Sequence, residues 1–230
     1  MSLPRLDTPS YEVKVPSTEK TIRFRPFLVK EYKILLTALE SDNTEIHRLV
    51  NELVDVCTFN KLDMNSLSNF DIEYIFLNIR AKSIGEISNV VMKCENCQTS
   101  IDVEMDVTKA EIFRNPEHSN KITITESMGL EMRYPKFEEM VNIYENFNSE
   151  KIVELICSCI KTVYTETDYY SDFTKDEVID FVNSFSKAQF EKLEKFFLTM
   201  PKVRQTLRAT CSNCSHHNET ILEGLQNFFV

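Results

Sequence analysis

Two cysteine pairs of the same form, C-x-x-C, most constrain what this chain can fold into. One pair is Cys94 with Cys97, and the other is Cys211 with Cys214. A two-residue spacer lets one tight turn direct two thiolate sulfurs at the same metal ion, and zinc prefers four ligands in a tetrahedron. The long segment between the pairs raises the cost of loop closure only logarithmically. The pattern therefore predicts one structural zinc ion bound by all four cysteines.

Each cysteine pair lies between segments that have the two-residue period of a β-strand. Such segments are 86–93 and 99–105 around the first pair, and 203–209 and 218–222 around the second. Each pair would then occupy the turn of a β-hairpin. Together the two hairpins predict a zinc ribbon whose halves are far apart in the sequence.

Three alternatives to a four-cysteine structural site stay open from the sequence, one of which is that the cysteines bind no metal. A thioredoxin-like redox site also uses C-x-x-C, but it requires a helix after the motif, whereas a strand follows both motifs here. His216 and His217 follow Cys214 and could replace one sulfur, although four cysteines already fill the shell. A catalytic zinc ion would need an open coordination position and a nearby general base, which no residue pattern supplies. We expect no enzymatic activity.

The rest of the chain predicts an α+β fold in four segments that form one intertwined domain. These are an N-terminal hairpin with a helical layer (1–85), the first zinc-knuckle hairpin with a β region (86–134), a helical insertion (135–201), and the second zinc-knuckle hairpin with a C-terminal tail (202–230). The tail ends on Phe228, Phe229 and Val230, which would either pack in the core or contact a partner. No internal repeat of the solenoid kind is found.

Helical periodicity and capping residues locate the expected helices. The helices are expected at 30–40, 69–82, 137–147, 150–164, 175–183 and 187–200, with a further apolar stripe from Ile46 to Cys57. Thr174 with Glu177, and Ser186 with Gln189, form capping boxes for the last two. Cys57, Cys157 and Cys159 fall on apolar helix faces, where a thiol acts as a small hydrophobic group.

Charge and hydropathy narrow the class of partner. The chain has 230 residues and a net charge of −10, which disfavours binding to nucleic acid phosphates and anionic membranes and favours protein partners. No apolar run approaches the roughly 20 residues that span a bilayer, and no secretory signal is present, so we expect a cytosolic location. Lys202, Arg204 and Arg208 alternate along one predicted strand. A zinc-ribbon regulator that binds nucleic acid is therefore the alternative function.

Several blocks of sequence resemble a known family. They are 16–18 with 22–31 (IRFRPFLVKE), 70–77 (FDIEYIFL), 80–86 (RAKSIGE) and 222–229 (LEGLQNFF). Together they resemble the baseplate hub assembly proteins of T-even-type (T4-like) myoviruses, in the version carried by marine phages. The blocks include both ends and the middle of the chain.

The resemblance implies a late phage protein that takes part in building the hub of a contractile tail baseplate. It implies other baseplate hub and tail proteins as partners, and no enzymatic activity. It places the protein in the host cytoplasm during assembly and leaves open whether the protein stays in the baseplate of the finished virion. Zinc does not come with the resemblance, so the metal site depends on the cysteine spacing alone.

Overall fold

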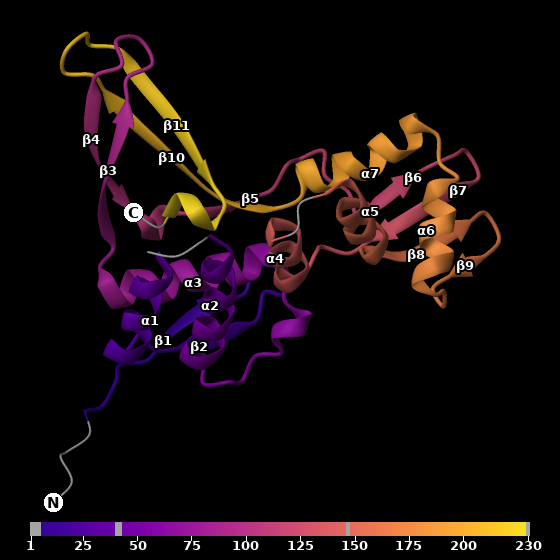
Figure 1. Ribbon diagram of the computed structural model, residues 1–230, viewed down its shortest axis with the longest axis horizontal. Helices are drawn as coiled ribbons and strands as arrows, with labels where there is room; N and C mark the ends of the chain where they lie inside the picture. The colour runs from indigo at the N-terminus through magenta and orange to yellow at the C-terminus, as the bar shows by residue number, and fades with distance from the viewer. Residues whose placement is uncertain (1–5, 40–42, 146–147, 229–230) are drawn as a thin grey trace, which may run out of the picture. The chain divides into compact units, whose positions relative to one another are not determined.

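The computed structural model describes residues 6–39, 43–145 and 148–228 (Figure 1). Helices and strands both occur throughout, which confirms the predicted mixed α+β class. The chain divides into two compact units: unit 1 comprises Met1–Phe113 with Lys202–Val230, and unit 2 comprises Arg114–Pro201. The four predicted segments stay an interpretation of the sequence. Within the described ranges, no helix is both long enough and apolar enough to cross a membrane.

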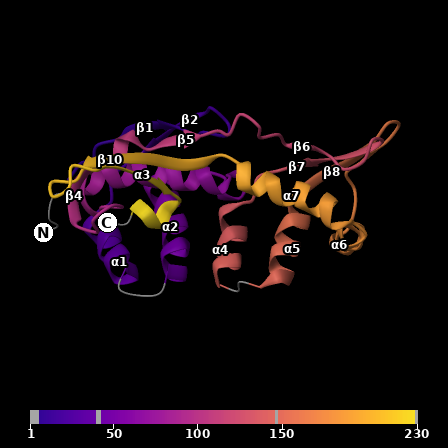
Figure 2. The same cartoon turned by 90° about the horizontal axis from the view of Figure 1, so that it is seen from above.

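Unit 1 begins with a β-hairpin and three helices. Its elements in chain order are β1 (Tyr11–Lys14), β2 (Thr21–Phe24), α1 (Val29–Leu39), α2 (Asn43–Cys57), the short 3-10 helix η1 (Met64–Ser66) and α3 (Asn69–Ile84). The two strands pair antiparallel, with Tyr11 opposite Phe24. Figure 2 shows α1 and α2 as a helical hairpin. The predicted helix end at residue 40 lies outside the described residues.

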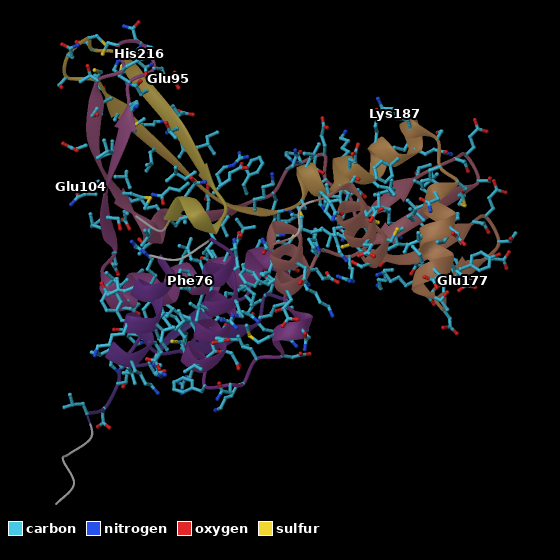
Figure 3. All side chains as sticks on the ribbon, viewed as in Figure 1. Phe76, Glu95, Glu104, Glu177, Lys187 and His216 are labelled. Carbon is cyan, nitrogen blue, oxygen red and sulfur yellow. The ribbon has the colours of Figure 1, made fainter. Side chains whose placement is uncertain are left out.

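Helix α3 is buried on most of its circumference, as its apolar residues predict. Phe76, labelled in Figure 3, is fully buried among the helices. The helix begins with a capping box in which the Asp71 carboxylate accepts a hydrogen bond from the backbone N–H of Ser68 at 2.9 Å. The same carboxylate accepts the N–H of Ser17 at 2.8 Å. Asp71 therefore fastens the turn of the N-terminal hairpin to the start of α3.

The C-terminal end of the chain packs onto unit 1. After the last strand, the 3-10 helix η3 (Leu225–Phe228) buries Leu225 and Phe228, which are 2% and 0% exposed. The buried carboxyl group of Glu73 on α3 accepts a hydrogen bond from the backbone N–H of Leu225. Phe228 is thus part of the core, while the last two residues of the predicted apolar end lie outside the described residues.

Two small sheets complete unit 1. The first contains β3 (Ile87–Lys93) and β4 (Ser100–Asp106), and the second contains β11 (His217–Glu223), β10 (Lys202–Thr210) and β5 (Glu111–Phe113) in that order, with the 3-10 helix η2 (Val107–Lys109) between β4 and β5. All neighbouring strands in both sheets are antiparallel. The four long strands are the ones that the sequence predicts around the cysteine pairs.

Unit 2 contains a four-stranded antiparallel sheet and four helices. Its elements are β6 (Lys121–Thr123), β7 (Met128–Met132), α4 (Phe137–Glu145), α5 (Ser149–Ser158), β8 (Ile160–Thr165), β9 (Tyr169–Tyr170), α6 (Lys175–Asn183) and α7 (Lys187–Thr199), and the sheet order is β6-β7-β8-β9. Both predicted capping boxes, at the start of α6 and α7, are confirmed.

The helix predicted at 150–164 is wrong in its second half, so the segment 135–201 is not purely helical. Helix α5 ends at Ser158, and β8 follows it and pairs with β7. Residues 160–165 contain β-branched side chains at four of six positions, which suits a strand when a partner strand is present. The predicted helix end at 147 lies outside the described residues.

Candidate metal centre

The two C-x-x-C motifs occupy the turns of two β-hairpins that lie side by side (Figure 1). Strands β3 and β4 pair from Ile87 opposite Asp106 to Lys93 opposite Ser100, immediately before and after the first turn. Strands β10 and β11 pair in the same way up to Thr210 opposite His217. Regular pairing up to each motif fixes the direction in which the turn points.

The two turns have the same backbone geometry. In the first, the N–H of Gln98 donates to the carbonyl of Cys94 at 2.9 Å; in the second, Ser215 donates to Cys211 at 2.9 Å. The residue after each second cysteine has a positive φ, 60° at Gln98 and 59° at Ser215. This left-handed residue closes the turn, so that both sulfurs of the pair point to the same side.

The four sulfur atoms form one cluster. The sulfur of Cys94 lies 3.6 Å from that of Cys214, and the sulfur of Cys97 lies 3.6 Å from that of Cys211. All four lie within 4.8 Å of one another. Four sulfurs at the usual zinc distance in a tetrahedron are about 3.8 Å apart. The donor atoms and their spacing therefore fit a tetrahedral ion such as zinc, and all four sequence-predicted site residues are brought together.

Hydrogen bonds favour the thiolate form of the two cysteines in the first turn, Cys94 and Cys97. The Thr99 hydroxyl and N–H contact the Cys97 sulfur, and Asn213 Nδ2 donates to it at 3.6 Å; these contacts lower the pKa of Cys97 to about 5. For Cys94, burial raises the pKa, but N–H groups of the turn outweigh burial and lower it overall. A metal ligand must be deprotonated, so these contacts favour metal binding.

The thiol form of Cys214, in the second turn, is favoured instead. The His216 N–H lowers the pKa of Cys214, but burial and hydrogen bonds with the sulfurs of Cys97 and Cys94 raise it overall to about 11. Thiolates so close together repel one another, because each negative charge disfavours the next. A bound dication would remove that repulsion, as it inverts the local electrostatics.

Two buried amide side chains hold the hairpins together. Asn218 on β11 is 2% exposed, and its Oδ1 accepts the backbone N–H of Glu95 in the other turn at 2.9 Å. Figure 3 shows Glu95 beside His216 at the tips of the hairpins. At the base, Gln205 Nε2 donates to the carbonyl of Asp106 at 2.9 Å. Each hairpin is thus tied to the other at both ends.

The apolar core between the hairpins is small. Its buried members are Met92, Cys94, Ile101 and Cys211, with Cys97, Val103, Ala209 and Cys214 packed against them. Four of these eight residues are the cysteines themselves. A core of this size cannot hold two long hairpins together by burial alone, so cross-linking at the sulfurs would contribute much of their stability.

Among the described residues, the cluster of possible metal ligands comprises the four cysteines and includes neither His216 nor His217. His217 Nδ1 lies 2.9 Å from the Thr210 hydroxyl. Cys57, Cys157 and Cys159 are buried in helical regions, as predicted, and burial raises the pKa of each. The sequence pattern missed Asn218, whose only signal is its position four residues after Cys214.

Comparison with known proteins agrees with the resemblance seen in the sequence. A family model described as "T4 bacteriophage base plate protein" matches residues 8–230. The chain is 27% identical over 225 residues to "Baseplate hub assembly protein gp26" of Enterobacteria phage T4, which covers 95% of this chain and 96% of that protein. No solved structure matches the chain. The chain therefore belongs to the T4 bacteriophage base plate protein family.

Proposed function

We propose that this protein is a non-enzymatic part or assembly factor of the hub of a contractile tail baseplate. It binds other hub and tail proteins, and a structural zinc ion on Cys94, Cys97, Cys211 and Cys214 stabilises it. It works in the host cytoplasm during assembly and in the tail baseplate if it stays in the virion. Membership of the baseplate family supports the assembly role.

The sulfur cluster is the observation that carries the structural part of the proposal. It joins segments from the middle and the end of the chain, so a metal ion there would fix the ribbon as one rigid part. Four thiolates complete a tetrahedral zinc shell and leave no position for a reactive water molecule, which favours a structural over a catalytic role. A rigid part on an acidic surface suits the binding of other proteins.

The cationic strand that motivates the nucleic-acid alternative is neutralised within its own hairpin. Arg204 Nε donates to Glu223 at 2.8 Å, and Lys202 Nζ lies 3.6 Å from the same carboxylate. Arg208 Nε donates to Glu219 at 2.6 Å. A lysine or arginine that is already paired with a carboxylate displaces few counterions when it meets a phosphate group. We therefore expect the protein to retain little nucleic acid in a filter-binding assay, at low salt and at high salt alike.

Co-expression tests the assembly role. The full chain, carrying a tag, would be produced together with each of the other baseplate proteins of the same phage, one at a time. We expect at least one of them to purify with it in a fixed ratio. Failure of every baseplate protein to do so, together with tight salt-dependent retention of nucleic acid, would replace this proposal by the nucleic-acid alternative.

A further inference from the structure

Two arginine–glutamate clasps with the same hydrogen bonds occur in the two units. Arg25 follows β2 directly, its Nη2 donates to Glu31 Oε1 at 2.9 Å, and its backbone N–H donates to the carbonyl of Cys57 at 2.9 Å. Arg133 follows β7 directly, its Nη2 donates to Glu139 Oε1 at 2.6 Å, and its N–H donates to the carbonyl of Cys159 at 2.8 Å. In both clasps the glutamate is six residues after the arginine.

The agreement extends to the first turn of the helix that follows each arginine. Glu31 Oε2 accepts the N–H of Leu28 at 2.6 Å, and Glu139 Oε2 accepts the N–H of Lys136 at 2.8 Å. Each arginine also donates to the carbonyl of the next residue, at 2.9 Å and 3.1 Å respectively. A β-hairpin precedes each clasp and a pair of helices follows it, α1 with α2 and α4 with α5 (Figure 2). The chain thus contains one supersecondary module twice.

The repeat allows the outer surfaces of the two helix pairs to be compared position by position. Counting from the clasp glutamate, Ile34 on α1 corresponds to Asn142 on α4. Counting from the clasp cysteine, Leu49 and Val56 on α2 correspond to Lys151 and Ser158 on α5. The three α4 and α5 residues are exposed and polar. Ile34 and Val56, however, are 49% and 37% exposed and apolar. Because the same architecture is built with polar residues in unit 2, the module itself does not require apolar ones there.

These apolar residues line a groove between α1 and α2. The groove has a volume of about 190 Å³; its apolar lining is Ile34, Leu49, Leu53 and Val56, and charged residues, Glu52 and Lys30 among them, line it too. Pockets for drug-sized ligands start at about 300 Å³, so the space suits a side chain of a protein partner better than a small molecule. A groove between two helices is the site at which a third, amphipathic helix packs.

The charged residues at the groove indicate which charge a partner would carry. In unit 2, Glu154 corresponds to Glu52 and pairs with Lys151 at 2.8 Å and Lys175 at 3.3 Å. Across the described residues, Glu52 has no ion pair. The groove's own lysine, Lys30, lies 3.5 Å from Glu31. If two copies of the protein met through this groove, the groove of the second copy would therefore offer Glu52 no unpaired cation. A different protein with a basic side chain at this point would offer one.

We propose that the groove between α1 and α2 binds an amphipathic helix of another baseplate protein. An apolar side chain of that helix packs against Ile34, Leu49 and Val56, and a lysine or arginine beside it pairs with Glu52. The proposal depends on the proposed function, since it identifies one surface by which the protein binds its baseplate partners.

Residues taken from the second module provide a test with a low risk to the fold. The variant I34N/L49K/V56S gives α1 and α2 the residues that α4 and α5 carry at the same positions. A control variant, V91N/I221S, removes two apolar side chains that are 67% and 50% exposed on strands β3 and β11. Each full-length variant is co-expressed with each baseplate protein of the same phage, and its Kd for every protein that the unaltered chain retains is measured.

We expect the triple variant to bind one of these proteins at least about tenfold more weakly, while the control variant binds it normally. Glu52→Lys should weaken binding of the same protein, and reversal of one basic residue in the partner helix should restore it. If the triple variant loses helix content by circular dichroism, Glu52→Lys alone decides the test.

If the triple variant and Glu52→Lys both bind the baseplate protein with unchanged affinity, the groove is not its binding site. That result would overturn this proposal and leave the proposed function intact. Retention of no baseplate protein by the unaltered chain would overturn both. A change of the chain from dimer to monomer in the triple variant, seen by sedimentation, would show that a second copy fills the groove and would also overturn the proposal.

Discussion

The amide of Asn218 offers a sharp test of how the two hairpins are coupled. Its Oδ1 accepts the N–H of Glu95 at 2.9 Å, and its Nδ2 donates to the carbonyl of His216 at 3.1 Å and more weakly to that of Ala209 at 3.4 Å. Only the first of these bonds crosses from one hairpin to the other. Asn218→Ala removes all three without touching a sulfur ligand.

The expected loss follows from the one bond that breaks when the hairpins separate, the bond to Glu95. A buried hydrogen bond contributes about 1 kcal/mol net, and more is lost when its partner stays unsatisfied, so its removal should cost about 1–2 kcal/mol. Because a factor of ten corresponds to about 1.4 kcal/mol, amide exchange through opening of the hairpins should be about 5- to 30-fold faster.

Hydrogen exchange followed residue by residue is the suitable assay, because two compact units need not unfold in one step. Protected amides of β3 and β4 are informative, since Asn218 itself lies on β11. Asn89→Ala on β3 is the matched control, because Asn89 is exposed. If exchange of β3 and β4 is no faster in Asn218→Ala than in the control, the amide does not couple the hairpins and the reasoning is wrong.

Two further predictions concern unit 1. Arg25→Ala removes the buried partner of the Glu31 carboxylate, which is 6% exposed, and leaves only the exposed Lys30 beside it. This change should cost about 3–5 kcal/mol in urea unfolding. Arg23→Ala breaks an exposed pair and should cost below about 1 kcal/mol, so equal costs for the two variants would contradict the clasp. Burial raises the pKa of Glu73 from 4.5 to about 7. Between these two pH values the folded state therefore binds more protons than the unfolded state, so the free energy of unfolding should fall as pH rises from 4.5 to about 7. Glu73→Gln should lack this fall. Parallel plots of unfolding free energy against pH for the two proteins would refute the prediction.

Local patterns were sufficient to predict the hairpins, the C-x-x-C turns and most helices. The turns are specified by cysteine spacing and by strand alternation on both sides, which are short-range signals. The capping boxes at Thr174 and Ser186 located helix starts for the same reason, because the cap and its partner are three residues apart. Agreement of propensity, pattern and capping in one segment makes such predictions reliable.

Features that depend on distant partners could not be predicted from the sequence. Residues 160–165 continue the apolar period of α5, and pairing with β7 on one side and β9 on the other makes them a strand. Asn218 becomes structural because a turn from another part of the chain presents an N–H to it. Each arginine–glutamate clasp joins a residue just after a strand to the first turn of the next helix. No single strand or helix period connects the two residues, so the repeated module stays hidden until the hydrogen bonds are compared.

The most direct test of the account is the metal content of the purified chain, measured by native mass spectrometry. One zinc ion per chain is expected in the unaltered protein and in Cys57→Ser, whose thiol lies in a helical core. Cys94→Ser and Cys211→Ser, one from each hairpin, should each lose the ion, because the two turns share it. Full zinc content in either of these two variants, or its absence from the unaltered protein, would contradict a shared four-cysteine site.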